Sequence, residues 1–383
     1  MPKRPERADR SRAQAAGASG RRGRLVLLAR LRREAAHLGR FARSDRHWSM
    51  PFAAALASGA PLLVGAWFGH LAYGLVSSLG GMVFLYLPST ALQHRMVWLM
   101  ACGFGMIACY TLGLVSHLVA PMLVPVLIAI AVLVMMCVRL YSVGPPGGLF
   151  FIMSTAIGAY TPVSVEGFPT LVGLNALGCL LAALVAFFYS LHDLRRRPPQ
   201  PAGAAGIPGF DVLVLEPVVI GSFAGIALGI AQLLQMVRPY WVPVSCLAVI
   251  QGASLRAVWN KQVQRILGTG VGVAVAWACL AASPGPWAVA AMVMTLSFVV
   301  ETLVVRHYGS AAVFITPLTI LLADAASLGQ GSPGWLIRAR LVDTVLGAVI
   351  GLLGGFCLHH SGIRAALRTG LRRLMPGFAS QRA

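Results

Sequence analysis

The chain has 383 residues, of which 57% are hydrophobic and 11% charged, and its formal net charge is +20. Soluble domains carry about 25% charged residues, so this composition excludes an ordinary water-soluble protein and is typical of a polytopic membrane protein. Nucleic acid is not indicated as a partner, because the basic residues come with no RNA-binding aromatic motif or finger spacing.

The N-terminal region, residues 1–47, is a basic segment that comes before the first apolar stretch. It holds fourteen Lys/Arg against four acids. Basic segments next to a membrane remain in the cytoplasm and contact anionic lipid. We therefore predict a cytoplasmic tail with an interfacial helix over 24–46. The long Arg-rich stretch does not have the layout of a cleavable signal peptide.

Apolar segments separated by short polar or Pro/Gly breaks predict an all-α fold with about twelve transmembrane helices in two sets of six. The first set lies near 51–69, 71–87, 96–114, 118–137, 148–160 and 169–190, and the second near 216–236, 240–252, 262–282, 286–303, 309–325 and 335–358. The predicted domains are the first repeat (48–192), a basic Pro/Gly-rich linker (193–215), the second repeat (216–360) and a basic cytoplasmic tail (361–383).

Two of the apolar segments are too short to cross a bilayer as regular helices. Residues 148–160 and 240–252 supply thirteen positions each and have prolines nearby, whereas ~30 Å of hydrocarbon needs about 20 helical residues. We expect short or broken helices there, buried among their neighbours. Transporters build substrate sites from such elements.

A weak internal repeat relates the two sets. A shift of 167 residues aligns five chemically similar pairs: Gly103 with Gly270, Gly105 with Gly272, Arg139 with Arg306, Tyr141 with Tyr308, and His94 with Lys261. An even number of spans gives both units one orientation, related by a pseudo-twofold axis along the membrane normal.

The distribution of charge predicts the orientation. With the N-terminus inside, 28 of the 31 Lys/Arg fall on the cytoplasmic side, and only Arg238, Arg338 and Arg340 fall on the other. Positively charged loops remain in the cytoplasm. We therefore predict that both termini and the linker are cytoplasmic.

The stretch KQVQRILGTGVG (261–272) is not a nucleotide-binding loop, because it leads into a membrane span and lacks the strand and acidic residue of such motifs. Lys261, Arg265, Gly268 and Gly272 share one helix face. Gly268 and Gly272 form a GxxxG motif, which is more often a helix-packing feature than a site.

The basic residues beside this motif predict a cytoplasm-facing anion funnel, formed by Arg256, Asn260, Lys261 and Arg265 at the positive end of a helix. Ordinary positive-inside anchoring explains such a cluster equally well. Both interpretations remain open from the sequence.

Three stretches together carry a family resemblance: RPYWVPVSCLAVIQ, QRILGTGVG and RLVDTVLGAVIGLLGG. They resemble the fusaric acid resistance family of inner-membrane proteins, which includes aromatic carboxylic acid exporters. The positions that carry the resemblance are Tyr240, Trp241, Pro243, Arg265, Gly268, Thr269, Gly272, Arg340, Asp343, Thr344, Gly347 and Gly351. The first half lacks the Tyr-Trp-x-Pro motif and has Trp98 in the place of Arg265.

The resemblance implies a bacterial inner-membrane protein that exports organic anions, namely aromatic or other weak carboxylic acids. A periplasmic adaptor protein is a partner that the resemblance implies, and further copies of the chain are another candidate. The larger bacterial exporters of the family carry a long soluble region between the halves, where this chain has only a short linker.

Asp343 is the acidic residue that we single out. It lies inside the last predicted span, where an ionisable side chain is costly and by default functional. A buried carboxylate there is a candidate for proton coupling. A structural alternative is a local pair with Arg340, three residues earlier on the same face.

Further candidates come from the second half. Tyr240 and Trp241 are able to stack an aromatic substrate, although interfacial anchoring is the commoner use of such residues. Gln251 is a hydrogen-bonding candidate for substrate or for a neighbouring helix. Gly347 and Gly351 are predicted to pack helices.

The leading hypothesis is therefore a proton-driven exporter of organic anions. The alternatives are a passive anion channel and a non-transporting membrane scaffold in envelope assembly. An enzyme is not expected, because we find no nucleophile–base motif, cofactor signature or metal cluster; the seven cysteines include no CxxC pair.

Overall fold

The computed structural model describes residues 46–201, 208–282, 284–324 and 333–374, together with the isolated residues 39, 41, 42, 44 and 206. Residues 1–38, which hold most of the predicted basic tail, lie outside the described residues, and so do 375–383. Within the described part every regular element is a helix, which confirms the predicted all-α class.

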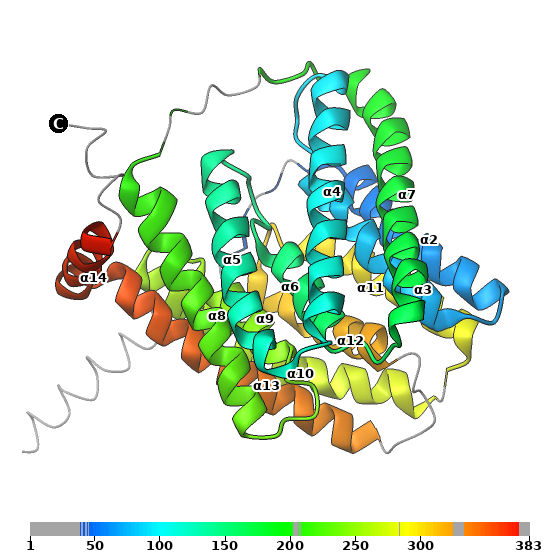
Figure 1. Ribbon diagram of the computed structural model, residues 1–383. Coiled ribbons are helices and arrows are strands. Elements are labelled where there is room, and N and C mark those ends of the chain that lie inside the picture. The colour runs from blue at the N-terminus through cyan, green and yellow to red at the C-terminus, as the bar shows by residue number, and fades with distance from the viewer. Residues whose placement is uncertain are drawn as a thin grey trace, which may run out of the picture. The chain divides into compact units, whose positions relative to one another are not determined.

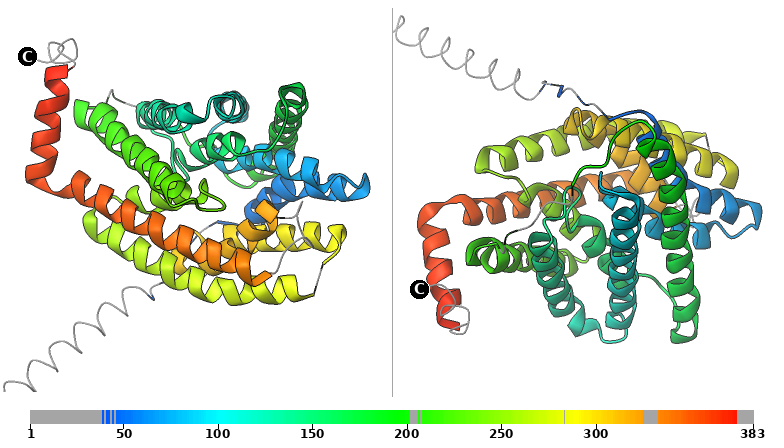
Figure 2. Two further views of the ribbon diagram at one scale, coloured as in Figure 1. Left: turned by 60° about the horizontal axis from the view of Figure 1, so that its bottom comes forward. Right: turned by 90° about the horizontal axis from the view of Figure 1, so that it is seen from above.

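The helices of the first half are α2 (Ser49–Trp67), α3 (Leu71–Gly81) with its 3-10 extension η1 (Met82–Tyr86), α4 (Leu92–Ser116), α5 (Leu123–Leu140), α6 (Leu149–Ala159) and α7 (Phe168–Leu194). Those of the second half are η4 (Asp211–Leu215), α8 (Glu216–Leu233), α9 (Trp241–Ile250), α10 (Leu255–Ala281), α11 (Pro286–Leu303), α12 (Tyr308–Asp324) and α13 (Pro333–His359) (Figure 1). The chain then turns into α14 (Ser361–Leu374), which leaves the end of α13 at a steep angle (Figure 2).

Eight helices, rather than about twelve, are long and apolar enough to cross a membrane in the described chain: α2, α4, α5, α7, α8, α10, α11 and α13. The other four predicted segments are helical but shorter, namely α3, α6, α9 and α12. A helix of ten residues, such as α9, extends only about 15 Å, half of a hydrocarbon core. The protein is a multi-pass helical membrane protein, with spans of unequal length.

The short helices α6 and α9 are buried among their neighbours, as their length predicts. Nine of the ten residues of α9 are buried, and so are eight of the eleven in α6. A helix surrounded by protein meets few lipids, so it need not match the bilayer thickness. Tyr240 and Trp241, at the start of α9, are therefore core residues.

Helices pair in the same way within each half. In the first half α4 packs against α6, α3 against α7, and α4 against α7. In the second half α10 packs against α12, α9 against α13, and α10 against α13. The contacts between the halves also correspond, because α5 packs on α8 as α11 packs on α2.

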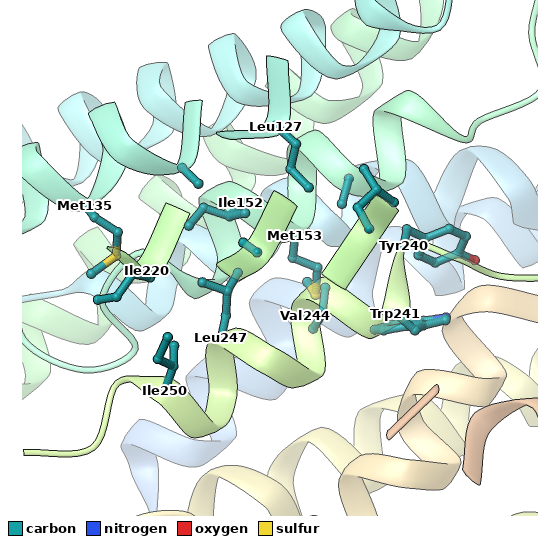
Figure 3. Close-up of a cluster of buried hydrophobic side chains, with 14 of the residues drawn as sticks. Leu127, Met135, Ile152, Met153, Ile220, Tyr240, Trp241, Val244, Leu247 and Ile250 are labelled. Carbon is teal, nitrogen blue, oxygen red and sulfur yellow. The ribbon is translucent and has the colours of Figure 1, made fainter. Parts of the chain in front are cut away.

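Two apolar clusters join the halves. One lies where α5 and α6 meet α8 and α9, and it includes Leu127, Ile152, Ile220, Val244 and Leu247 (Figure 3). The other lies where α2 meets α11, and side chains of α10 and α12 also belong to it. Where apolar surface is removed from water, burial stabilises a contact by about 25 cal/mol per Å². Where the helices lie within lipid, close packing of the side chains stabilises the contact.

Large apolar side chains on the opposite helix faces point outward. Phe104, Leu133, Leu267 and Leu353 are all more than half exposed. On a soluble protein such residues would form an aggregation-prone surface, whereas on a membrane helix they contact lipid tails. This pattern fits the multi-pass class.

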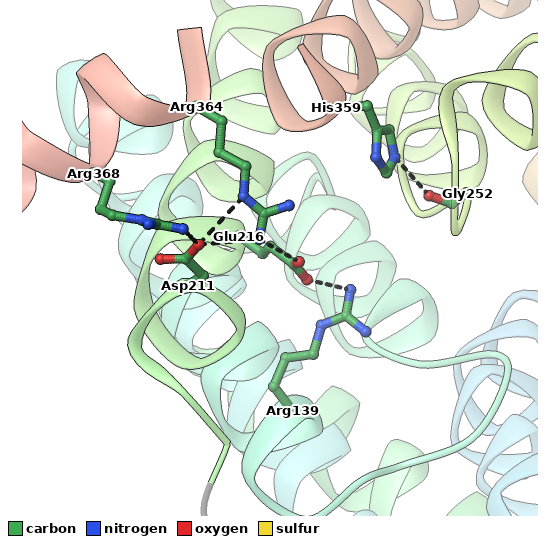
Figure 4. A network of polar contacts seen from close by, with 7 residues as sticks. All are labelled: Arg139, Asp211, Glu216, Gly252, His359, Arg364 and Arg368. Carbon is green, nitrogen blue, oxygen red and sulfur yellow. Dashed lines mark hydrogen bonds and ion pairs between the residues drawn. The ribbon is translucent and has the colours of Figure 1, made fainter. Parts of the chain in front are cut away.

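A charged network joins the first half, the second half and α14 (Figure 4). Arg139 at the end of α5 lies 3.1 Å from Glu216, and Arg364 lies 3.7 Å from the same carboxylate. Asp211 pairs with both Arg364 and Arg368. The predicted C-terminal tail thus begins as a helix held by ion pairs, and helical structure resumes at Asp211 inside the predicted linker.

Candidate functional site

The site begins on α10, which runs without interruption through KQVQRILGTGVG. Ser254 caps its N-terminus by accepting a hydrogen bond from the Ala257 backbone N–H at 3.2 Å. The glycines therefore continue a helix and do not form a loop. The phosphate-loop interpretation rejected on sequence grounds has no geometry here to support it.

The two glycines of this stretch bring α12 close to α10. A Cβ on Gly268 would lie 2.6 Å from the Ala312 Cβ, and a Cβ on Gly272 would lie 2.4 Å from the Val313 carbonyl oxygen. Only glycine allows such an approach. Arg265, on the same face of α10, is thereby brought within reach of α12.

Arg265 is a buried cation whose hydrogen bonds go to neutral groups. Its residue is 7% exposed. Nη1 donates to the Tyr308 hydroxyl at 2.9 Å and Nη2 to the Ser245 Oγ at 3.2 Å, while Nε has no partner. No carboxylate of the described chain forms an ion pair with it. A buried charge without a counterion is costly, so this guanidinium is suited to an external anion.

Arg95 in the first half shows the structural alternative. It is also buried, at 3% exposure, but its Nη1 lies 3.0 Å from the Asp193 carboxylate and its Nε donates to the Thr90 carbonyl at 2.7 Å. This charge is neutralised within the protein. Both arginines are buried, but in the described chain only Arg95 has an acidic partner and a partner for its Nε.

The position of the first half that aligns with Arg265 holds no cation. Trp98 lies there, and its ring contacts the Tyr141 ring edge-on, with centroids 6.4 Å apart. The aligned residues in the second half, Arg265 and Tyr308, form a hydrogen bond. The same pair of positions is therefore in contact in both halves, with a guanidinium in the second half only.

The other residues of the predicted funnel lie at different depths. The Lys261 ammonium lies 5.8 Å from the centre of the Tyr308 ring, so it shares that residue with Arg265. Asn260 is half-buried, and its Oδ1 has no hydrogen-bond partner. Arg256, the second residue of α10, is exposed. The structure brings Lys261 and Arg265 together around Tyr308 and leaves Arg256 at the surface.

Tyr240, Trp241 and Gln251 are not grouped with Arg265. The centroids of the Tyr240 and Tyr160 rings lie 5.9 Å apart. Tyr240 and Trp241 both belong to the buried cluster of Figure 3. The Arg340 guanidinium lies 3.9 Å from the centre of the Trp241 ring. The Gln251 side chain lies beside Gly147 in the first half.

Asp343 is 1% exposed, and its Oδ2 has no hydrogen-bond partner. Arg340, one turn earlier, donates to the Thr319 hydroxyl at 2.7 Å besides lying over Trp241. Trp241 and Ser245 are four residues apart on α9, so the levels of Arg340 and Arg265 differ by about 6 Å along that helix. No ion pair joins Arg265 to Asp343 in the described chain.

Gly347 and Gly351 hold α13 against α9. A Cβ on Gly347 would lie 2.4 Å from the Val242 carbonyl oxygen and 2.6 Å from the Ser245 Cβ. A Cβ on Gly351 would lie 2.7 Å from the Cys246 carbonyl oxygen. These contacts fix the position of Ser245 relative to α13.

Sequence reasoning missed the two hydroxyl partners of Arg265. Ser245 lies within the stretch that carries the family resemblance, and Tyr308 belongs to a pair aligned by the repeat, but neither was singled out as a site residue. Ser245 is twenty residues from Arg265 and Tyr308 forty-three. The repeat was the signal that pointed to Tyr308.

Comparison with known proteins shows which family part of this chain resembles. Residues 226–354 match the family model described as fusaric acid resistance protein-like. This match confirms the resemblance drawn from the sequence, and it covers the end of α8, all of α9 to α12 and most of α13. The chain is also 23% identical to an uncharacterised membrane protein of Bacillus subtilis, YvaC, over 81% of this chain and 72% of that protein. No solved structure matches the chain.

Proposed function

We propose that the protein is a bacterial inner-membrane transporter that exports organic anions, in particular aromatic or other weak carboxylic acids. The observation that carries the proposal is the buried Arg265 guanidinium, which has hydroxyl partners and no acidic one in the described chain. An anion from the cytoplasm would meet Lys261 beside Tyr308 and then Arg265. The direction of transport and the substrate class rest on the family resemblance.

In this proposal the two halves are six-helix repeats, related to each other by a pseudo-twofold axis along the membrane normal. The matching helix pairs within and between the halves support it. The contact of Trp98 with Tyr141 and of Arg265 with Tyr308 supports it at the level of single residues. The second repeat would carry the anion site, since Trp98 replaces the arginine in the first.

Both termini and the linker are cytoplasmic in the proposed orientation. The ion pairs Arg95–Asp193, Arg139–Glu216 and Arg364–Asp211 all join helix ends that this orientation places on the same side. This agreement supports the 28-to-3 distribution of Lys/Arg between the two sides.

The orientation predicts the labelling of the linker. In a variant without native cysteines, Gln200→Cys should react with a membrane-impermeant maleimide only after the inner membrane is opened. A cysteine in the opposite loop, at Gln235, should react in intact spheroplasts. Labelling of position 200 in sealed spheroplasts would show that the orientation is reversed.

Asp343 is the proposed coupling acid. It is buried and has an unpartnered oxygen, and a carboxylate in such a place is able to carry a proton across a non-polar region. The Asn side chain keeps the shape of Asp but cannot ionise. Asp343→Asn should therefore separate substrate movement from proton movement.

Proteoliposomes loaded with labelled benzoate test the function. With the membrane potential clamped, wild-type protein should move benzoate against its gradient when a pH gradient is imposed, and the pH change should follow the flux. Asp343→Asn should lose this accumulation and retain benzoate/benzoate exchange. Flux that follows the membrane potential without proton movement would instead identify a passive anion channel.

A different experiment distinguishes a transporter from a non-transporting membrane scaffold. Deletion of residues 1–46 should leave transport in vesicles unchanged, because the proposed path lies within the second half. A scaffold would use the basic tail as its working surface, so its cellular function would be lost. Absence of benzoate flux from both proteins would favour the scaffold.

A further inference from the structure

We propose that Tyr308 and Ser245 are anion-binding residues, which together with Arg265 form a carboxylate seat (Arg265, Tyr308 and Ser245). The inference rests on the proposed function and deepens it, since it names the groups that hold the substrate's acidic end. Tyr308 lies on α12, Ser245 on α9 and Arg265 on α10, and both α9 and α12 pack against α10.

The direction of the hydrogen bonds leaves both hydroxyl protons available. A guanidinium only donates hydrogen bonds, so Tyr308 and Ser245 accept from Nη1 and Nη2. A hydroxyl that accepts still has its own proton to donate. Each of the two residues therefore presents an O–H to whatever lies beside Arg265.

Ser245 does not donate back to its own helix, as several helical hydroxyls of the described chain do. Ser58, Thr111 and Thr316 each donate to the carbonyl four residues earlier, at 2.8 to 3.0 Å. In the described chain Ser245 makes no such bond to Trp241, although its side chain is fully buried. Ser78 and Ser154 also have buried hydroxyls without a partner, and Ser190 accepts from Arg95 in the same way. The Ser245 proton therefore indicates a ligand because it lies beside Arg265, which, unlike Arg95, has no acidic partner in the described chain.

The donors at the seat match a carboxylate. Arg265 Nε, the Tyr308 hydroxyl and the Ser245 hydroxyl are three donors beside one full positive charge. A carboxylate is an acceptor with two oxygens and about four lone-pair sites. A neutral amide or ester lacks the charge, and an amide brings donors of its own, so the seat should select the ionised acid.

The Lys261 ammonium reinforces this selection. It lies over the ring of Tyr308, while Arg265 holds the hydroxyl of the same residue. Two cations on one phenol draw electron density from its oxygen, which makes the phenolic O–H a better donor to an anion. Tyr308 thus connects the outer cation of the funnel to the buried one.

The test measures benzoate binding to purified protein in nanodiscs, with benzamide as the neutral analogue. Tyr308→Phe and Ser245→Ala should each weaken benzoate affinity about fivefold to tenfold, and the double variant should weaken it further. Benzamide binding should stay as weak as in the wild type. Tyr110→Phe and Ser58→Ala are matched controls, because both side chains are buried in the first half and neither is a hydrogen-bond partner of Arg265.

Each outcome has one meaning. Partial unfolding would lower the number of binding sites and leave the dissociation constant of the folded fraction unchanged, so the constant is the decisive quantity. Loss of affinity in Arg265→Ala with wild-type constants in Tyr308→Phe, Ser245→Ala and the double variant would overturn the seat and leave the proposed function standing. Absence of saturable benzoate binding and of benzoate flux in the wild type would overturn the proposed function and the seat together.

Discussion

Arg265→Ala should weaken the apparent affinity for transported carboxylates about ten- to hundredfold, while the protein still inserts and accumulates. Loss of a charge-assisted hydrogen bond costs about 1.5–3 kcal/mol, which corresponds to this range. The variant removes a buried charge that has no acidic partner in the described chain, so it leaves no carboxylate unpaired. Concentration-dependent uptake into inverted vesicles measures the effect.

Arg265→Lys should recover only part of the affinity. Lysine keeps the charge but lacks the planar fork, so it cannot donate to Tyr308, Ser245 and a bidentate carboxylate at once. The Arg:Lys:Ala series therefore separates the charge from the geometry of the guanidinium.

Arg95→Ala is the matched control and should show the opposite behaviour. Its removal leaves Asp193 without its partner at 3.0 Å, so the melting temperature should fall while carboxylate affinity stays near that of the wild type.

Wild-type concentration dependence of Arg265→Ala at matched expression would contradict the prediction. Arg265 would then be a topology anchor, and Lys261 and Arg256 would compensate for its loss. The anion funnel would then be wrong.

Gly347→Val should prevent the protein from reaching a stable folded state. The added side chain would begin 2.4 Å from the Val242 carbonyl oxygen and 2.6 Å from the Ser245 Cβ, so α9 and α13 would have to separate. Because α9 has only ten residues, it depends on such contacts for its position. Overpacking of this kind typically costs about 1–3 kcal/mol and more where backbone is struck.

Size-exclusion chromatography and thermal melting in detergent measure this effect. Gly270→Val is the matched control, because a Cβ at that position of α10 meets nothing within 4 Å. It makes the same substitution inside a membrane helix and should leave a monodisperse protein. Equal melting temperatures for the two variants would show that the α9–α13 contact is not needed for stability.

The sequence alone was sufficient for the helices and for their order along the chain. Each apolar segment predicted between 51 and 358 contains a helix, and the stretch 261–272 is helical throughout. The one-face arrangement of Lys261, Arg265, Gly268 and Gly272 follows from helix periodicity, which depends only on spacing. Local hydropathy and spacing determine such features because both act over a few turns of one helix.

The tertiary structure decided which side chains meet, and which helices are surrounded by protein apart from α6 and α9, whose short length already predicts burial. Hydropathy does not distinguish a helix that faces lipid from one that faces other helices, because both surroundings are apolar. For this reason hydropathy predicts spans at α3 and α12, which are shorter than a full crossing needs, and it leaves Tyr240 and Trp241 open between substrate stacking and interfacial anchoring, whereas both are buried. The partners of Arg265 depend on the crossing of α9, α10 and α12, a contact between segments 20 to 43 residues apart that no local pattern encodes.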